Sequence, residues 1–221
     1  MELTILTCTG DRPEQFRHCE VYMARQTLQA TRWIVVDDGR TPTVVTMGQS
    51  VIRRGPSATV AESFCGNLLE GLHSVRTPAV AIIEDDDWYA PGWLEACVNG
   101  LRTAELFGEQ QARYYNLRDN RWHIFRNTER ASLCATALRT ACIPYLNAYL
   151  ERRAGTAADL SLWKSPIRSK LCVRTAMVVG LKGHPTGRRG AASGHLRHAH
   201  WPHDPERRIL RTWIGDDAQR Y

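Results

Sequence analysis

The chain has 221 residues, of which 43% are hydrophobic, and a formal net charge of +6. This length predicts a single domain with one sizeable core. No stretch approaches the roughly 20 apolar residues that a membrane span needs, and the N-terminus lacks the pattern of a signal peptide. We therefore expect a cytoplasmic protein without a membrane span. The basic excess favours a polyanionic partner, such as a nucleic acid or a diphosphate.

Seven cysteines are scattered along the chain, and none forms a Cys-x-x-Cys pair. They are Cys8, Cys19, Cys65, Cys97, Cys134, Cys142 and Cys172. An odd, dispersed set among apolar neighbours indicates reduced core thiols rather than a disulfide framework or a zinc site.

The first half of the chain alternates short apolar runs, which predict strands, with apolar residues spaced three and four apart, which predict helices. In chain order these are a strand at Leu3 to Cys8, a helix from Pro13, a strand at Trp33 to Val36, short edge strands at Val44-Val45 and Val51-Ile52, a helix at Ala58 to Val75, a strand at Ala79 to Ile83 and a helix from Pro91 to Leu101. Buried strands separated by helices predict an α/β fold with a mostly parallel sheet covered on both faces. Ligands of such sheets bind at the carboxyl ends of the strands.

The second half is less regular, and no internal repeat or linker divides it from the first. Its pattern predicts two strands within Arg113 to Phe125, a helix at Ala135 to Leu150 kinked at Pro144, a strand within Leu171 to Leu181, a glycine-rich basic loop at Lys182 to Gly194 and a last helix at Glu206 to Trp213.

Four adjacent carboxylates, Glu84-Asp85-Asp86-Asp87, follow the predicted strand at Ala79 to Ile83 and precede Trp88-Tyr89. Such a run is commonly a solvated loop, but here it lies where a buried strand reaches the surface. Adjacent anions there raise one another's pKa values unless a cation holds them. Magnesium and manganese prefer oxygen ligands and bridge to phosphates, so the run predicts a metal site. In an extended segment Glu84 faces the same side as Asp86, and Asp85 the same side as Asp87.

Three segments in order carry a resemblance to a known family. They are the opening strand with its loop, Leu3 to Pro13; the turn Ile34-Val-Val-Asp-Asp-Gly39; and the acidic segment Ile82 to Trp93. Together they resemble glycosyltransferase family 2 and its relatives with the GT-A fold. The resemblance implies one Rossmann-like α/β domain over residues 1–221, with a mostly parallel mixed sheet. Residues 1–104 would bind the nucleotide-sugar and residues 105–221 the acceptor.

The resemblance also implies roles for individual residues in binding the donor, which would be a UDP-sugar. Thr7, Thr9 and Arg12 would line the nucleotide pocket, and Asp38 or its neighbour Asp37 would accept a hydrogen bond from the uracil or ribose. Asn67 lies where the family often places a residue that contacts the donor. The simpler alternatives are an Asx turn for Asp37-Asp38-Gly39 and a solvated loop residue for Arg12.

The implied metal ion is Mn²⁺ or Mg²⁺. In the family's usual Asp-x-Asp-Asp frame Glu84 replaces the first aspartate, so Asp86 becomes the principal ligand. The other frame, Asp85 with Asp87, stays open. A late histidine often completes such sites, and His195 fits that role best.

Two further roles are expected in the second half. Lys182, Arg188 and Arg189 could close over the diphosphate from a flexible loop, or could be solubilising surface residues. The resemblance also implies a general base in the second half of an inverting enzyme, and Asp159 would fill this role; the alternative is a residue that stabilises a helix N-terminus.

The acceptor is the least determined part of the prediction. Arg113 to Arg130 interleaves arginine with aromatic residues, which suits nucleic acid. We therefore hypothesise a hydroxymethylated pyrimidine in phage DNA, modified within an infected bacterial cell. The same aromatics could form a core or a sugar platform, for a glycan, protein or small-molecule acceptor. Another metal-dependent phosphate enzyme and a non-catalytic nucleotide-binding module are the remaining alternatives.

Overall fold

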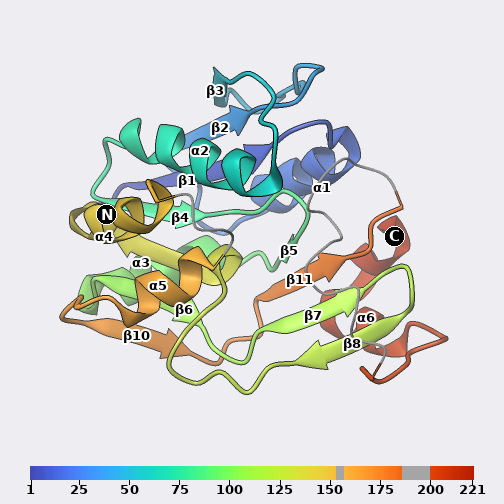
Figure 1. Ribbon diagram of the computed structural model, residues 1–221. Helices are drawn as coiled ribbons and strands as arrows, with labels where there is room; N and C mark the ends of the chain where they lie inside the picture. The colour runs from blue at the N-terminus through green and yellow to red at the C-terminus, as the bar shows by residue number, and fades with distance from the viewer. Residues whose placement is uncertain (153–156, 186–199) are drawn as a thin grey trace.

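A seven-stranded sheet forms the centre of the computed structural model, which describes residues 1–152, 157–185 and 200–221 (Figure 1). The strand order is β10-β6-β9-β4-β1-β2-β3. The strands are β1 (Leu3–Thr9), β2 (Arg32–Asp37), β3 (Ser50–Arg53), β4 (Ala79–Ile82), β6 (Leu106–Glu109), β9 (Thr136–Arg139) and β10 (Lys170–Val173). Only β9 runs antiparallel to its neighbours, β4 and β6, so the predicted mostly parallel mixed sheet is confirmed.

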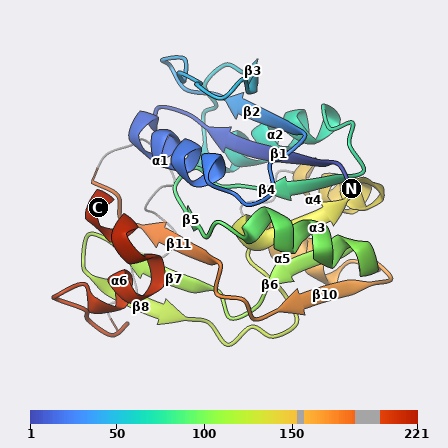
Figure 2. The ribbon, with the colours of Figure 1, turned by 180° about the vertical axis from the view of Figure 1, so that it is seen from behind.

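Helices cover both faces of this sheet (Figures 1 and 2). On one face lie α2 (Val60–His73), α4 (Ile143–Leu150) and α5 (Ala158–Lys164), and on the other lie α1 (Pro13–Ala24) and α3 (Trp93–Thr103). Helix α2 begins where a capping box forms, because Thr59 accepts a hydrogen bond from the Glu62 amide and the Glu62 carboxylate accepts one from the Thr59 amide. Helix α1 begins at Pro13, whose fixed φ suits the first turn.

A second, four-stranded sheet was not expected from the sequence. Its order is β5-β11-β7-β8, and its strands are β5 (Trp88–Tyr89), β7 (Arg113–Asn116), β8 (Arg121–Ile124) and β11 (Val178–Lys182). Helix α6 (Arg208–Ile214) and the 3₁₀ segment η3 (Gly215–Arg220) lie beside it (Figure 2). Because β5 follows the acidic run directly, this sheet builds one wall of the site at the end of β4.

The prediction was wrong for two parts of the chain. Val44-Val45 forms no strand. The helix expected from residue 135 begins only at Ile143, because a 3₁₀ turn, η1 (Leu133–Ala135), strand β9 and a second 3₁₀ turn, η2 (Thr140–Cys142), come first. Pro144 lies in the first turn of α4 and kinks nothing. Strand β6 was not predicted at all.

Two other expectations for the second half agree with the structure. The two strands expected within Arg113 to Phe125 are β7 and β8, and the last helix is α6. The segment Leu171 to Leu181 contributes to two strands, β10 and β11, rather than one. All seven cysteines are free thiols. Within the described ranges, no helix is both long and apolar enough to cross a membrane.

Candidate active site

The acidic run forms a turn at the carboxyl end of β4. Strand pairing with β1 continues to Ile83, whose amide donates to the Leu6 carbonyl, and the Asp87 amide then lies 3.5 Å from the Glu84 carbonyl oxygen. The expectation that the run is extended is therefore wrong. A turn brings Glu84 beside Asp87, three residues on, instead of aligning alternate residues.

Arg12 forms the first of two cationic contacts with this turn. It stands at the N-cap of α1, and its Nη2 lies 2.9 Å from Oδ1 of Asp85 and 3.2 Å from the Cys8 carbonyl oxygen. Its Nη1 lies 3.8 Å from Asp86. Arg12 was expected to line the nucleotide pocket, which stays a prediction; in the structure it is the counter-ion of the fully buried Asp85 side chain.

Lys182 forms the second contact, and it is not on a flexible loop as expected. It is the last residue of β11, where the Leu181 amide donates to Asp87 Oδ1 at 2.9 Å. Lys182 is only 8% exposed, and its ammonium lies 3.0 Å from Asp87, 3.7 Å from Asp86 and 3.9 Å from Glu84. Pairing between β5 and β11 thus delivers a fixed cation to three carboxylates.

Four carboxylates face two cations, which leaves a formal excess of two negative charges. Burial raises the pKa of Asp85 to about 7, although Arg12 opposes the shift. Burial and then Asp87 raise the pKa of Glu84, and burial raises the pKa of Asp87. These shifts indicate that the fixed cations do not fully compensate the run.

Asp86 is the exception among the four. Burial alone would raise its pKa, but Lys182, Arg12 and His184 outweigh burial and lower the pKa below its usual value. The same attraction raises the pKa of Lys182 against the effect of burial, so its ammonium is charged. Asp86 is therefore the carboxylate of the run that is most firmly ionised.

A divalent ion fits the residues of this turn. Ligand atoms of Glu84, Asp87 and Cys134 lie within 4.8 Å of one another, and Asp87 Oδ2 is buried without a hydrogen-bond partner. The Glu84 side chain is 34% exposed, so the group opens to the surface. Cys134, expected only to pack, stands in this group because η1 passes beside the turn.

His184 is the histidine that the structure places at the site. Its Nε2 lies 2.9 Å from the Asp86 carbonyl oxygen, which can only accept, so this nitrogen carries the proton. Burial lowers the pKa of the His184 ring, although the Asp86 carboxylate opposes the shift. His195, Arg188 and Arg189, which were expected at the site, lie outside the described residues.

The turn after β2 separates the roles of its two aspartates. Asp37 accepts hydrogen bonds from the Gly39 amide at 2.8 Å and the Thr43 amide at 2.7 Å, and it pairs with Arg53. Both of its oxygens therefore hold the turn together. Asp38 Oδ2 lies 3.3 Å from Ser57 Oγ, and Asp38 Oδ1 lies over Gly10. Asp38 therefore contacts the segment after β3 and the loop after β1, whereas Asp37 serves the turn itself.

Two glycines bring the loops after β1 and β2 together. A Cβ on Gly10 would lie 2.5 Å from Asp38 Oδ1, and one on Gly39 would lie 2.6 Å from the Asp11 amide nitrogen. Thr9 ends β1 and is 1% exposed. Thr7 is completely buried and accepts a hydrogen bond from Trp33 Nε1 at 3.0 Å, so in this structure it serves the core.

Asn67 points from α2 toward the segment after β3. Its Oδ1 accepts a hydrogen bond from Arg54 Nη1, and the side chain is buried. Asn67 was expected to contact the donor, whereas no sequence signal pointed to Arg54.

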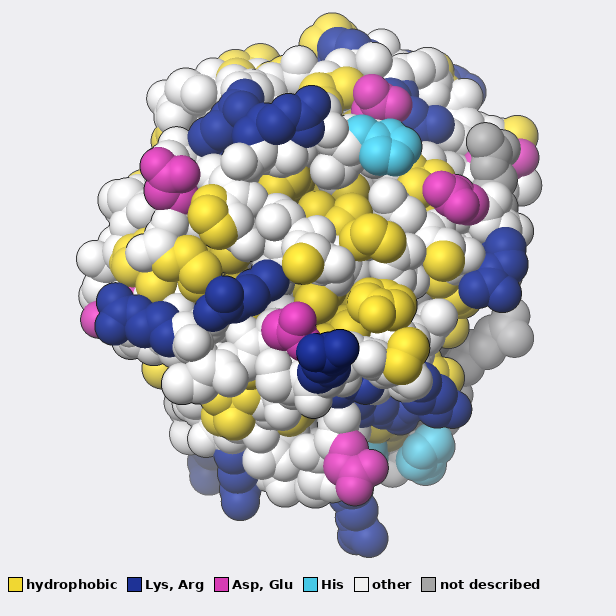
Figure 3. All heavy atoms as spheres, turned by 90° about the vertical axis from the view of Figure 1, so that its left-hand side faces the viewer, with side chains coloured by type: hydrophobic (Ala, Val, Ile, Leu, Met, Phe, Trp, Pro, Cys, Tyr) yellow, Lys and Arg dark blue, Asp and Glu magenta, His cyan; other side chains and the backbone are white. Residues whose placement is uncertain are grey.

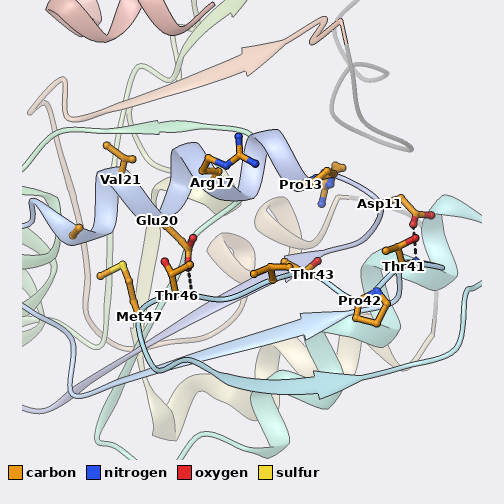
Figure 4. Close-up of a pocket in the computed structure, with 13 residues that line it drawn as sticks. Asp11, Pro13, Arg17, Glu20, Val21, Thr41, Pro42, Thr43, Thr46 and Met47 are labelled. Atoms are coloured by element: carbon orange, nitrogen blue, oxygen red, sulfur yellow. Dashed lines mark hydrogen bonds between the residues drawn. The ribbon is translucent and has the colours of Figure 1, made fainter.

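A cavity of about 590 Å³ lies between α1 and the segment that follows β2, as Figure 4 shows. Asp11 and Thr41 are joined by a hydrogen bond at one end, and Glu20 accepts a hydrogen bond from the Thr46 amide further along. Of the residues expected to bind the donor only Arg12 lines it, so the cavity is not the site described above.

The model of one protein family, glycosyl transferase family 2, matches residues 5–152. The chain belongs to glycosyl transferase family 2. The matched segment contains the loop after β1, the turn after β2 and the acidic run. Lys182 and His184 lie beyond it. None of the curated proteins compared with the chain matches it.

Several solved structures share the fold of this chain. Staphylococcus aureus TarS, residues 1–349 in complex with UDP, has a TM-score of 0.62 at 12% identity; 82% of this chain matches 60% of that one. The mannosyltransferase PcManGT from Pyrobaculum calidifontis, in complex with GDP-Man and Mn²⁺, has a TM-score of 0.53 at 14% identity, covering 80% and 56%. A cytidylyltransferase from Thermus thermophilus has a TM-score of 0.53 at 13% identity, covering 80% and 90%. The chain thus spans less than two thirds of the TarS chain's length.

Asp159 also lies beyond the segment matched by family 2. It stands in the first turn of α5, where its Oδ1 accepts from the Leu160 amide, and burial raises its pKa. In the parts of the chain that the structure describes, no hydrogen bond or ion pair joins Asp159 to the acidic run. Its role as general base stays a prediction.

Most aromatics of the segment Arg113 to Phe125 contact one another or other aromatic rings. Tyr114 packs edge-to-face on Phe125, His123 stacks on Trp201 with centroids 5.1 Å apart, and Trp122 meets Trp213. This arrangement agrees with the alternative in which they form a core.

Proposed function

We propose that this chain transfers a sugar from a nucleotide-sugar donor, a UDP-sugar, to a hydroxyl group of an acceptor with the help of Mn²⁺ or Mg²⁺. The observation that carries the proposal is the buried turn after β4, where, in the part of the chain that the structure describes, four carboxylates have Arg12 and Lys182 as their ion-pair partners. A divalent ion would offset the excess charge. TarS in complex with UDP and PcManGT in complex with GDP-Man and Mn²⁺ share the fold.

The residues divide into those that would hold the metal ion and those that would hold the nucleotide. Glu84, Asp86 and Asp87 would hold the ion, which when bound stabilises the negative charge of the departing diphosphate. Arg12 and Lys182 keep these carboxylates in place and add positive charge at the same point.

The two halves of the chain would share the work. Residues 1–104 supply the turn and the loops beside it, and Asp38 would accept a hydrogen bond from the base. Residues 105–221 supply Lys182 and would bind the acceptor. Asp159 would remove the proton of the acceptor hydroxyl; burial raises the pKa of its carboxyl, which makes the carboxylate a stronger base.

Titration calorimetry with UDP in the presence and absence of Mn²⁺ tests the donor and metal together. The wild-type protein should bind UDP only with the metal, and Asp86→Ala should lose this binding. Asp216→Asn, a change of an exposed aspartate, is the control and should bind normally. Equal UDP binding without metal, or by Asp86→Ala, would show that the acidic run has been misassigned.

Nucleotidyl transfer is the second candidate, because the Thermus cytidylyltransferase shares the fold at a similar TM-score. The two reactions release different products. A glycosyltransferase that meets water in place of its acceptor releases UDP and free sugar, whereas a nucleotidyltransferase releases pyrophosphate from a nucleoside triphosphate. Assaying both products with the same preparation separates the candidates.

We also propose, for the acceptor, a hydroxymethylated pyrimidine in DNA, in a phage-infected cell. The exposed arginines of the β7–β8 region, Arg118, Arg126 and Arg130, support this choice. On the face opposite to the carboxyl ends of the strands, Lys and Arg side chains are spread out, with Asp and Glu between them (Figure 3). A target base in a duplex would have to be flipped out.

Gel-shift binding across a salt series tests the DNA acceptor. The affinity for DNA should fall steeply with salt, and replacing Arg118, Arg126 and Arg130 by glutamine should reduce both the affinity and the salt slope. Absent or salt-insensitive binding at low ionic strength leaves the glycosyltransferase intact and removes DNA as its acceptor.

A further inference from the structure

Arg54 follows β3 at the same edge of the sheet as the acidic run, and hydrogen bonds hold both its backbone and its side chain. Its backbone amide donates to the Asp37 carbonyl at 2.9 Å, and its guanidinium donates to Asn67 Oδ1 on α2. Among the described residues, no carboxylate lies within ion-pairing distance of it. Arg54 is therefore a half-buried cation held by a neutral amide.

Gly66 makes room for this guanidinium on α2. A Cβ at position 66 would lie 2.4 Å from Arg54 Nη2, 2.6 Å from Nη1 and 2.7 Å from Cζ. The guanidinium thus lies directly on the helix backbone. Glycine is unfavourable in a helix interior compared with alanine, so its presence here gives up helix stability for the space that Arg54 occupies.

The sheet order places Arg54 at a definite distance from the metal-binding turn. Strands β4, β1, β2 and β3 are successive neighbours, so the end of β3 lies about 14 Å from the end of β4 at the usual strand spacing. Asp38, at the end of β2, lies between them, and Ser57 from the segment after Arg54 reaches its carboxylate. A nucleotide with its diphosphate at the acidic run, and with its base extended along this edge toward β2 and β3, would bring the base to Asp38 and Arg54.

We propose that Arg54 binds the donor's nucleobase by donating a hydrogen bond to a base carbonyl oxygen, beside Asp38, which accepts from the base N–H. Asn67 is then a positioning residue: its amide oxygen holds Arg54 and does not touch the donor. This inference rests on the proposed donor, because it assumes that the diphosphate lies at the acidic run. A guanidinium carries five donors, so Asn67 does not exhaust it.

Arg54→Met removes the donors and keeps a side chain of similar length. Binding of UDP and of uridine, both measured by calorimetry with Mn²⁺, should weaken about tenfold or more, as expected for one lost hydrogen bond to a charged group. Binding of inorganic pyrophosphate with Mn²⁺ should not change, because it has no base. Arg76→Met, a change of an exposed arginine just past the other end of α2, is the matched control.

Gly66→Ala is a second variant that displaces the guanidinium without removing its charge. Alanine favours the helix and the displaced group is the end of a flexible side chain, so the melting temperature should stay the same or rise while UDP affinity falls. A merely structural role for Gly66 would not separate these two readouts.

Two results overturn the role of Arg54 but leave the proposed donor standing. One is that Arg54→Met binds UDP and uridine with wild-type affinity. The other is that Arg54→Met loses pyrophosphate binding equally, which would make Arg54 a phosphate contact. Failure of the wild-type protein itself to bind UDP with Mn²⁺ is a different outcome. It overturns the proposed donor, and the role of Arg54 falls with it.

Discussion

Asp37 and Asp38 are adjacent, but their carboxylates have different partners. The Asp37 carboxylate has two backbone amides of the turn and Arg53, at the end of β3, as its partners. Asp37→Asn should therefore lower the free energy of unfolding by about 2 kcal/mol or more, since it weakens buried bonds to a charged group. Asp38→Asn should instead weaken UDP binding about tenfold with a stability change below about 1 kcal/mol. Chemical denaturation and calorimetry on both variants check this; the reverse pattern would exchange their roles.

Lys182 occupies the position between carboxylates where a metal ion would also be attracted. Lys182→Met leaves Asp86 and Asp87 without this counter-ion, so without metal the protein should lose about 3–5 kcal/mol of stability. Mn²⁺ should then stabilise the variant more than the wild type, because the competing ammonium is gone. Thermal unfolding with and without Mn²⁺ measures this, with Lys182→Arg as the charge-preserving control. An equal Mn²⁺ effect in Lys182→Met and the wild type would mean that metal and lysine use separate carboxylates.

Glu109 connects the two sheets at the level of secondary structure. It ends β6, and its Oε2 accepts from Thr175 Oγ1 and the Met177 amide, both at 2.6 Å, in the segment that leads from β10 to β11. Glu109→Gln replaces one acceptor oxygen by a donor and should lower stability by about 1–3 kcal/mol. Because β11 carries Lys182, UDP affinity should fall as well. Stability loss with unchanged UDP affinity would show that β11 is held in place without this clamp.

The elements that the sequence predicted are those with local signals. Strands β1, β2 and β4 are continuous apolar runs, and α2 has both a periodic apolar stripe and a capping box. Strands β6 and β9 are not continuous apolar runs, because Gly108 and Glu109 interrupt the first, and Thr136 and Arg139 stand at the ends of the second. Residues 136–139 were predicted as helix because nothing local distinguishes them; their pairing with β4 and β6 decides their conformation.

The contrast between local signals and long-range contacts also applies to the candidate site. The acidic run and the turn at Asp37-Asp38 are contiguous in sequence and could be found there. The partners that complete them are distant: Lys182 reaches Asp87 across 95 positions, and His184 reaches Asp86 across 98. Arg54 and Asn67 meet only because β3 and α2 pack side by side. Long-range pairing of this kind has no signal in a single sequence.

At the scale of the whole molecule, the C-terminal segment closes the seam between α1 and the small sheet. Asp217 in η3 accepts from Trp88 Nε1 at 2.7 Å and pairs with Arg25 at 2.5 Å, while Arg220 donates to its other oxygen at 3.1 Å. Tyr221 adds a 2.6 Å hydrogen bond to Tyr22. Trp88 directly follows the acidic run, so its hydrogen bond to Asp217 ties the C-terminal segment to the strand that continues from the site.

Asp217 should make this closure sensitive to acid. Burial alone would raise its pKa, but the hydrogen bonds from Arg25, Trp88 and Arg220 outweigh burial and lower it. A carboxyl whose pKa is lower in the folded state stabilises the fold above its unfolded pKa of about 3.9 and loses that contribution as pH falls through the folded value. Asp217→Asn should therefore cost about 1–3 kcal/mol at neutral pH and less below about pH 4. Chemical denaturation of both proteins from about pH 7 to about pH 3 measures the difference, and a gap that stays constant over this range would show that Asp217 acts through packing rather than through its charge.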